Sequence, residues 1–322
     1  MKKIAILVFF TVGFFVHVWA CTGLIAGKQA TVDGSVLVTY SADSHTLYGA
    51  LTSSPAADWP KGSMRSIVEW DTNKPLGEIE QVEHTYAVMG NMNEHQLTVV
   101  ESTWGGRPEL VDTTGIIDYG SLMQLALERA KTAREAIKVM TGLVKKYGYY
   151  SSGESFTIAD PNEAWILDLI GKGPGRRGAV WVAVRIPDDC IAGHANYPRI
   201  HKIPMDDKEN CLYSPDVISF AREMGYFDGL NKDFSFARAY SPADFGALRA
   251  CDARVWSFFR KYDSTMDNYL PYVNGESAEP FPLYVKPSRK LSVQDMKEAM
   301  RDHFEDTPFD MTQDVGAGPF KV

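Results

Sequence analysis

The sequence predicts an α+β fold in which antiparallel sheets carry separate layers of helices. Three observations predict it: strand patterns come in consecutive runs, turn signals join neighbouring strands, and cap residues open the helical segments that follow each run. The order along the chain is therefore β, α, β, α. With 322 residues and no internal repeat or evident linker, we expect one domain over residues 21–322.

The first predicted hairpin directly follows an apolar leader. Residues 22–27 form a short apolar run, Asp33-Gly34 is a strong turn signal, and the β-branched segment 35–40 returns along the first strand. Folding the chain back at this turn brings the low forties opposite the start of the first strand. We therefore expect Asp43 to lie near Cys21.

The remaining elements follow from the same kinds of signal. The polar segment 91–96 is a turn between two strands. The glycine-rich segment 171–178 is a hairpin loop and not a phosphate-binding loop, because strands flank it on both sides. Strands are predicted over 84–90, 97–103, 155–160, 164–170 and 179–186. Helices are predicted to open at Ser121, Thr132, Ser214, Ser241 and Ser292, the second of them ending at Gly148.

Residues 1–20 have the pattern of a secretory signal peptide. Two lysines precede an uncharged stretch, and Val18 and Ala20 occupy the −3 and −1 positions of a cleavage site. A membrane-anchoring helix is the alternative, although 17 uncharged residues are at the short limit of a span. We expect cleavage after Ala20, a secreted or periplasmic protein, and no membrane contact once the signal is removed.

Charge and motif content exclude several function classes. The net charge is −8, and removing residues 1–20 with their two lysines takes it to −10, which disfavours a nucleic-acid partner. The seven histidines form no HExxH pair, and the four cysteines form no CxxC pair. We therefore expect neither a metal nor an organic cofactor. Pairing among Cys190, Cys211 and Cys251, and assembly into a homo-oligomer, stay open.

Cys21 would become the first residue of the mature chain. A lipid anchor is one interpretation, but Trp19 is unusual in a lipidation box, and the strand 22–27 needs burial where a lipoprotein would have a polar tether. A disulfide or a buried apolar role is also open. The catalytic interpretation is chemically coherent, because an N-terminal cysteine carries a nucleophile together with an α-amine whose pKa is roughly 8.

These residues resemble a family, the N-terminal-nucleophile (Ntn) hydrolases that start with cysteine, and in particular the PepD-like dipeptidases related to penicillin V acylases and bile salt hydrolases. The resemblance rests on CTGLIAGKQATVDGSVLVTYSADS, TYAVMGNMNEHQLTVVESTWGGRPEL, SGESFTIADPNEAWILDLIGKG and GHANYPRI. It implies a four-layer αββα sandwich with antiparallel sheets. It also implies a set of catalytic residues: Cys21 as nucleophile, Asp43 holding the N-terminal cysteine, Asn93 as oxyanion donor, Asn196 positioning the tetrahedral intermediate, and Arg254 as the distal arginine.

The chain departs from the family pattern at Tyr40, where relatives usually carry an arginine, so that a neutral hydroxyl replaces a fixed positive charge. The chain also stops at Val322 in a segment resembling a loop, and we expect it to be incomplete at this end.

The expected function is that of a secreted cysteine amidohydrolase, in the first place a dipeptidase that cleaves short peptides. The alternatives are an acyl-amide hydrolase of the bile salt or N-acyl amino acid type, and a non-enzymatic lipoprotein or binding protein. The expected partner is a small peptide or acyl-amide substrate. Glu101 and Arg107 are interpreted either as lining a substrate pocket or as surface residues.

Overall fold

The structure is a computed structural model that describes residues 21–43 and 49–313. The predicted signal peptide, residues 1–20, lies outside the described residues. The described chain is a mixture of helices and antiparallel sheets, which confirms the predicted α+β class. None of the helices in these ranges is long and apolar enough to cross a membrane.

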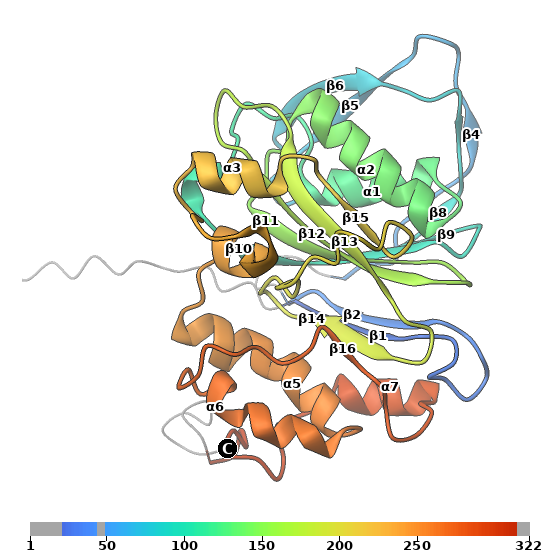
Figure 1. The fold of residues 1–322 in the computed structure, drawn as a ribbon. Coiled ribbons are helices and arrows are strands. Elements are labelled where there is room, and N and C mark those ends of the chain that lie inside the picture. The colour runs from blue at the N-terminus through green and yellow to red at the C-terminus, as the bar shows by residue number, and fades with distance from the viewer. Residues whose placement is uncertain (1–20, 44–48, 314–322) are drawn as a thin grey trace, which may run out of the picture.

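Two sheets form the centre of the molecule (Figure 1). The smaller sheet has the strand order β16-β14-β1-β2, and the larger has the order β15-β13-β12-β11-β10-β9-β8-β3, with antiparallel pairing throughout. The strands of the smaller sheet are β1 (Thr22–Ala26), β2 (Leu37–Ser41), β14 (Ile191–His194) and β16 (Tyr284–Val285). Those of the larger sheet are β3 (Ser53–Ser54), β8 (Val88–Met89), β9 (Met92–Asn93), β10 (Thr98–Gly105), β11 (Gly153–Ala159), β12 (Ala164–Gly171), β13 (Ala179–Ile186) and β15 (Cys211–Tyr213).

Helices cover the outer faces of the two sheets. In Figure 1, α1 and α2 lie over the larger sheet, and α5, α6 and α7 lie beyond the smaller one. The α-helices are α1 (Tyr119–Arg129), α2 (Ala133–Tyr147), α3 (Val217–Glu223), α4 (Phe236–Tyr240), α5 (Ala253–Arg260), α6 (Leu270–Val273) and α7 (Val293–Ala299). Short 3-10 turns cover Pro108–Leu110, Asn231–Asp233 and Ser264–Tyr269, and a π-helix over Ala247–Asp252 leads into α5.

Burial explains why the central strands are continuous apolar runs. Strands β11 and β12 are buried at every position, because helices pack on one face of their sheet and the smaller sheet lies on the other. Trp165 and Phe156 are fully buried beneath the apolar stripes of α1 and α2. Each such side chain contributes about 1.5–3 kcal/mol to folding by leaving water.

The predicted N-cap residues agree with the observed helix starts for some helices and not for others. Thr132 and Ser292 are N-caps as predicted, and Gly148 ends α2 with a φ of 81°. The first helix begins earlier than predicted, because the carboxylate of Asp118 accepts the N–H of Ser121 and takes the cap position. Ser214 and Ser241 open no helix directly: α3 begins at Val217, and residues 242–244 are irregular before the π-helix.

Two features were not anticipated in the first hundred residues. A separate hairpin pairs β5 (Met64–Val68) with β6 (Pro75–Glu80), outside both central sheets. The predicted strand over 84–90 is instead divided, since β7 (His84–Thr85) pairs with β4 (Ala57–Asp58) and β8 joins the larger sheet.

Candidate active site

Cys21 lies at the start of β1, where the first hairpin brings Asp43 beside it. The register pairs Thr22 with Ser41 and Gly23 with Tyr40, so the chain after β2 returns to the position of Cys21. The main-chain N–H of Asp43 faces the thiol and favours its ionised form. The carboxylate of Asp43 accepts a hydrogen bond from the hydroxyl of Ser41 at 2.5 Å. The predicted proximity of Asp43 to Cys21 is therefore confirmed.

Arg254, from α5, fixes the main chain of Cys21. Its Nη1 donates to the carbonyl oxygen of Cys21 at 2.8 Å and to the hydroxyl of Thr22 at 2.7 Å. Its Nη2 donates to Oδ1 of Asn196 at 2.8 Å. One guanidinium thus joins residues that are far apart in the sequence, and its planar array of donors suits this bridging position.

Asn196 sits in the turn after β14 with a left-handed backbone, φ 54°. Its Nδ2 donates to the carbonyl oxygen of Thr103 at 2.5 Å, and its main-chain N–H donates to the hydroxyl of Ser102 at 3.2 Å. Asparagine tolerates this conformation better than most residues, because its short polar side chain bonds locally. Strand β10 and the turn after β14 therefore hold Asn196 from two sides.

The buried His194 supports this turn from within the molecule. The hydroxyl of Ser102, which accepts the N–H of Asn196, is also hydrogen-bonded to Nδ1 of His194 at 2.7 Å. Nε2 of the ring is hydrogen-bonded to the hydroxyl of Thr157 at 2.8 Å. Burial and the nearby arginines lower the pKa of His194 to about 3, which keeps the ring neutral. Its role is to tie the two sheets together beside the site.

Asn93 is the predicted site residue that the structure does not bring to this group. Its Nδ2 donates to the carbonyl oxygens of Leu127 and Ala130 at 2.8 and 2.7 Å. Its Oδ1 accepts the main-chain N–H groups of His95 and Leu97. Both amide hydrogens are thus used to fasten the turn to the end of α1. These contacts correct the expectation of an oxyanion donor, because no hydrogen of the side chain is left for a substrate.

A cavity of about 410 Å³ opens in front of Cys21, within the range of small-molecule sites. Tyr40, Asp43 and Glu101 line its polar side. Asn91, from the same turn as Asn93, also lines it and donates to the carbonyl oxygen of Val99. The rest of the wall is largely aromatic and apolar, formed by Trp70, Tyr119, Met123 and Leu127.

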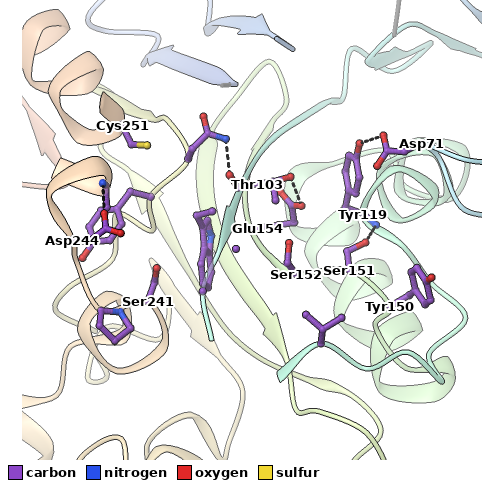
Figure 2. A pocket seen from close by; sticks show the side chains of 18 of the residues that line it. Asp71, Thr103, Tyr119, Tyr150, Ser151, Ser152, Glu154, Ser241, Asp244 and Cys251 are labelled. Atoms are coloured by element: carbon purple, nitrogen blue, oxygen red, sulfur yellow. Dashed lines mark hydrogen bonds between the residues drawn. The ribbon is translucent and has the colours of Figure 1, made fainter. Parts of the chain in front are cut away.

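A second cavity of about 720 Å³ adjoins the other side of the site and is shown in Figure 2. Asn196, Thr103 and Glu154 line it, and Tyr119 lines both cavities. In Figure 2 the hydroxyl of Tyr119 points to Asp71, to which it donates at 2.9 Å. The cavities therefore flank the group formed by Cys21, Asn196 and Arg254.

The interpretation of Glu101 as a pocket residue is supported, and that of Arg107 is not. Glu101 is buried on β10 and lines the cavity of Cys21. Arg107 instead donates to the carbonyl oxygen of Ala239 and stacks on Tyr226 with its guanidinium 3.7 Å from the ring centre. It lines neither of these two cavities.

Burial and two nearby buried carboxyls affect the ionisation of the thiol. Burial first, and then the charges of Glu101, Glu154 and Asp43, raise the pKa of Cys21 well above its ordinary value, while the hydrogen bond from the Asp43 N–H lowers it. The hydroxyl of Tyr40 donates to Oε1 of Glu101 at 2.5 Å. Burial and this carboxyl also raise the pKa of Tyr40, so Tyr40 acts as a neutral donor.

All four cysteines of the chain, Cys21, Cys190, Cys211 and Cys251, are free thiols. Within residues 21–43 and 49–313, no group of three or more His, Cys, Asp or Glu side chains is arranged to hold a metal ion.

Comparison with known proteins provides an independent view of the chain. Residues 20–320 match the family described as Peptidase family C69. The chain is 28% identical over 318 residues to a probable dipeptidase of Salmonella dublin, with 90% of this chain and 68% of that protein covered. It is 25% identical over 314 residues to a probable dipeptidase of Latilactobacillus sakei, with 90% and 62% covered. It is also 25% identical over 318 residues to dipeptidase A of Lactobacillus helveticus, with 92% and 64% covered. The chain thus spans about two thirds of the length of these relatives.

Proposed function

The chain belongs to peptidase family C69, and from this premise we propose that it is a peptide hydrolase of the dipeptidase type whose nucleophile is the thiol of Cys21. The observation that carries the proposal is that Arg254 donates hydrogen bonds to both the carbonyl oxygen of Cys21 and the side chain of Asn196. A nucleophile must be held within a fraction of an ångström of its productive position. The hydrogen bonds of Arg254 fix the main chain that bears the thiol.

The base for the reaction is the α-amine of Cys21 itself. In the full sequence the nitrogen of Cys21 is bound to Ala20 in a peptide bond and has no basic lone pair. Removal of residues 1–20 as an export signal creates the amine and delivers the protein to the periplasm or the exterior. Burial and the neighbouring carboxyls raise the pKa of the thiol and keep it protonated at rest, so its proton must leave during the attack. The amine of the same residue is within reach of that proton.

The reaction then proceeds in two stages. The sulfur of Cys21 attacks the scissile carbonyl carbon, its proton passes to the α-amine, and a tetrahedral oxyanion forms. The C–N bond breaks as the α-ammonium returns the proton to the leaving amine, which gives a thioester on Cys21. Water attacks this thioester while the α-amine takes one of its protons. The C–S bond then breaks to release the acid, and the α-ammonium returns that proton to the sulfur, which restores the thiol and the neutral amine.

Asn196 is the side chain best situated to stabilise the oxyanion. The carbonyl oxygen of Thr103 takes one of the two hydrogens on its Nδ2. The hydrogen bonds within the described ranges assign no acceptor to the other hydrogen, and Asn196 lines the larger cavity. Arg254 bound to Oδ1 orients the amide and polarises it. Asn196 thus takes the role that the family resemblance implied for Asn93.

The arrangement of layers is consistent with this proposal. The order helices, larger sheet, smaller sheet, helices agrees with the αββα sandwich of the Ntn hydrolases, in which the nucleophile begins a strand. Cys21 precedes β1 directly. We therefore assign the described residues to that fold and the mechanism to the cysteine Ntn type.

The test combines N-terminal sequencing of the exported protein with a dipeptide-library assay, using glycine-conjugated acyl amides in parallel. We expect a free N-terminal Cys21 and hydrolysis of dipeptides, abolished by Cys21→Ala and retained by Cys211→Ala, which removes another buried free thiol. A lipid-modified Cys21, full turnover by Cys21→Ala, or cleavage confined to the acyl amides would contradict the proposal.

A further inference from the structure

Glu101 and Glu154 form a pair of buried carboxyls between the two cavities. Strands β10 and β11 pair Thr103 directly with Glu154, so Glu101, two residues before Thr103, lies diagonally opposite Glu154 on the same face of the sheet. Glu101 is 3% exposed and Glu154 is fully buried. Glu101 lines the cavity of Cys21, and Glu154 lines the larger cavity.

Each carboxyl accepts a hydrogen bond from one neutral hydroxyl on Oε1, and its Oε2 accepts none from any hydroxyl in residues 21–43 and 49–313. Tyr40 donates to Oε1 of Glu101 at 2.5 Å, and Thr103 donates to Oε1 of Glu154 at 2.6 Å. Oε2 of each residue is buried, and among the described residues only the partner carboxyl and, for Glu101, the thiol of Cys21 are close enough to interact with it. The two carboxyls act directly on each other, so one proton held between them can serve both oxygens.

The pair then carries one negative charge that lacks a cation. The ion pairs among the described residues include neither Glu101 nor Glu154, and no lysine or arginine lines either cavity. A buried charge is normally paired, because its desolvation is costly. Asp71, held by Tyr119, adds further negative potential from the larger cavity. The α-amine of Cys21 must be neutral to act as the base of the proposed reaction, so it does not neutralise the pair. The missing partner is therefore a cation that arrives with the ligand.

We propose that Glu101 and Glu154 are the subsite for the α-ammonium group of the substrate, so that the site takes peptides with a free amino terminus. This inference rests on the proposed function and identifies its substrate class. The Oε2 atoms would accept the N–H groups of the ammonium, while Tyr40 and Thr103 hold the carboxyls in place from behind.

Covalent geometry selects which amino group can bind there. The α-nitrogen of the residue that supplies the scissile carbonyl is two bonds from the carbonyl carbon, so its subsite must adjoin the nucleophile. Glu101 meets this condition, since its carboxyl interacts with the thiol of Cys21 and both line one cavity. An amino group further along a peptide would lie too far from the reacting carbon. The pair thus favours removal of the first residue.

The test compares the dipeptide that the mature protein cleaves fastest with its des-amino and N-acetyl analogues. We expect the wild type to prefer the free dipeptide by at least ~30-fold in kcat/KM, the discrimination expected of a buried charged hydrogen-bonded contact. Glu101→Gln and Glu154→Gln should lose this preference by slowing the free dipeptide and sparing the des-amino analogue. Glu128→Gln is the matched control, because Glu128 is a buried glutamate that lines neither cavity.

The proposal is overturned if the wild type cleaves the des-amino analogue as fast as the dipeptide, or if the two variants slow both substrates equally. Calorimetry in the inactive Cys21→Ala background gives a readout independent of turnover. There the free dipeptide should bind more tightly than its des-amino analogue, and Glu101→Gln should abolish the difference. If the mature wild type hydrolyses no peptide, the proposed function fails, but equal binding of the two ligands is still what would refute the ammonium subsite.

Discussion

Nη1 of Arg254 lies 2.8 Å from the carbonyl oxygen of Cys21, across 233 residues of sequence. The same guanidinium reaches Thr22 and Asn196, so a single side chain aligns the start of β1 with the turn after β14. The packing of α5 against β14 fixes this geometry, and the free thiol of Cys21 lines the smaller of the two cavities.

Replacing Arg254 by lysine should therefore reduce activity more than stability. Lysine keeps the charge but cannot donate to Cys21, Thr22 and Asn196 simultaneously. Misplacing a reacting group by about 1 Å costs roughly 100-fold, and we expect a fall in kcat/KM of that order. The control is Arg260→Lys on the same helix, which alters an exposed ion pair with Asp267. Equal kcat/KM values for the two variants would show that the hydrogen bonds of Arg254 are not needed for activity.

Tyr40→Phe should move the acidic limb of the pH profile of kcat/KM to higher pH. Burial already raises the pKa of Glu101, and the hydrogen bond from Tyr40 opposes that rise. Without the hydroxyl, the pKa of Glu101 rises, so the anionic form of the Glu101–Glu154 pair appears only at a higher pH. Tyr226→Phe removes a matched tyrosine–glutamate hydrogen bond, to Glu109, and should leave the profile in place. A limb that stays fixed or moves toward acid in Tyr40→Phe would contradict this role of Tyr40.

Glu154→Gln should stabilise the protein at neutral pH while impairing its activity. Burial and Glu101 raise the pKa of Glu154 well above its ordinary value, so the folded protein keeps this proton where the unfolded chain has released it. Stability from this group is complete at low pH and is lost as pH rises toward the raised pKa. A neutral amide avoids that loss, and we expect a gain of about 1–2 kcal/mol in the free energy of unfolding at pH 7.

The same measurement at two pH values separates this effect from general repacking. Thermal or urea unfolding at pH 7 and at a pH near 4 should show the gain shrinking in acid, where the wild type is protonated as well. Glu128→Gln should show no such gain, because it loses a contact with Arg65. A gain for Glu154→Gln that is equal at both pH values, or a loss at pH 7, would be inconsistent with a buried charged pair.

Asn93→Ala and Asn196→Ala should affect different properties. Asn93 satisfies four main-chain groups, so its loss should lower the free energy of unfolding by about 1–3 kcal/mol and leave kcat of the folded enzyme within a few-fold. Asn196→Ala should lower kcat by roughly 100-fold or more, the usual cost of one oxyanion donor. The comparison requires kcat on folded protein and a denaturation curve for each. A reversal of the two effects would restore Asn93 as the donor.

The sequence predicted the parts of this site that depend on local geometry. A hairpin register is set by its own turn, so Asp43 could be placed beside Cys21 by counting residues from Asp33-Gly34. Asn196 could be placed in a turn because it lies just before Pro198. The family resemblance added Arg254, which no local pattern connects with Cys21.

Other parts depend on contacts between distant segments and were missed for that reason. The direction of an asparagine side chain in the turn 91–96 is set by its packing on α1, which the turn sequence does not encode. The link from Ser102 through His194 to Thr157 appears only when two sheets are stacked. A signal did exist for Glu101, since a glutamate inside the apolar strand 97–103 is expensive to bury and so indicates a special role.

The most direct test of the central claim is the intact mass of the mature protein quenched in acid during turnover of a slow peptide substrate. The account predicts a chain that begins at Cys21 and carries one acyl group as a thioester on that residue, and no adduct in Cys21→Ala. Steady turnover with no adduct on the peptide that begins at Cys21, or with the acyl group on another residue, would contradict it.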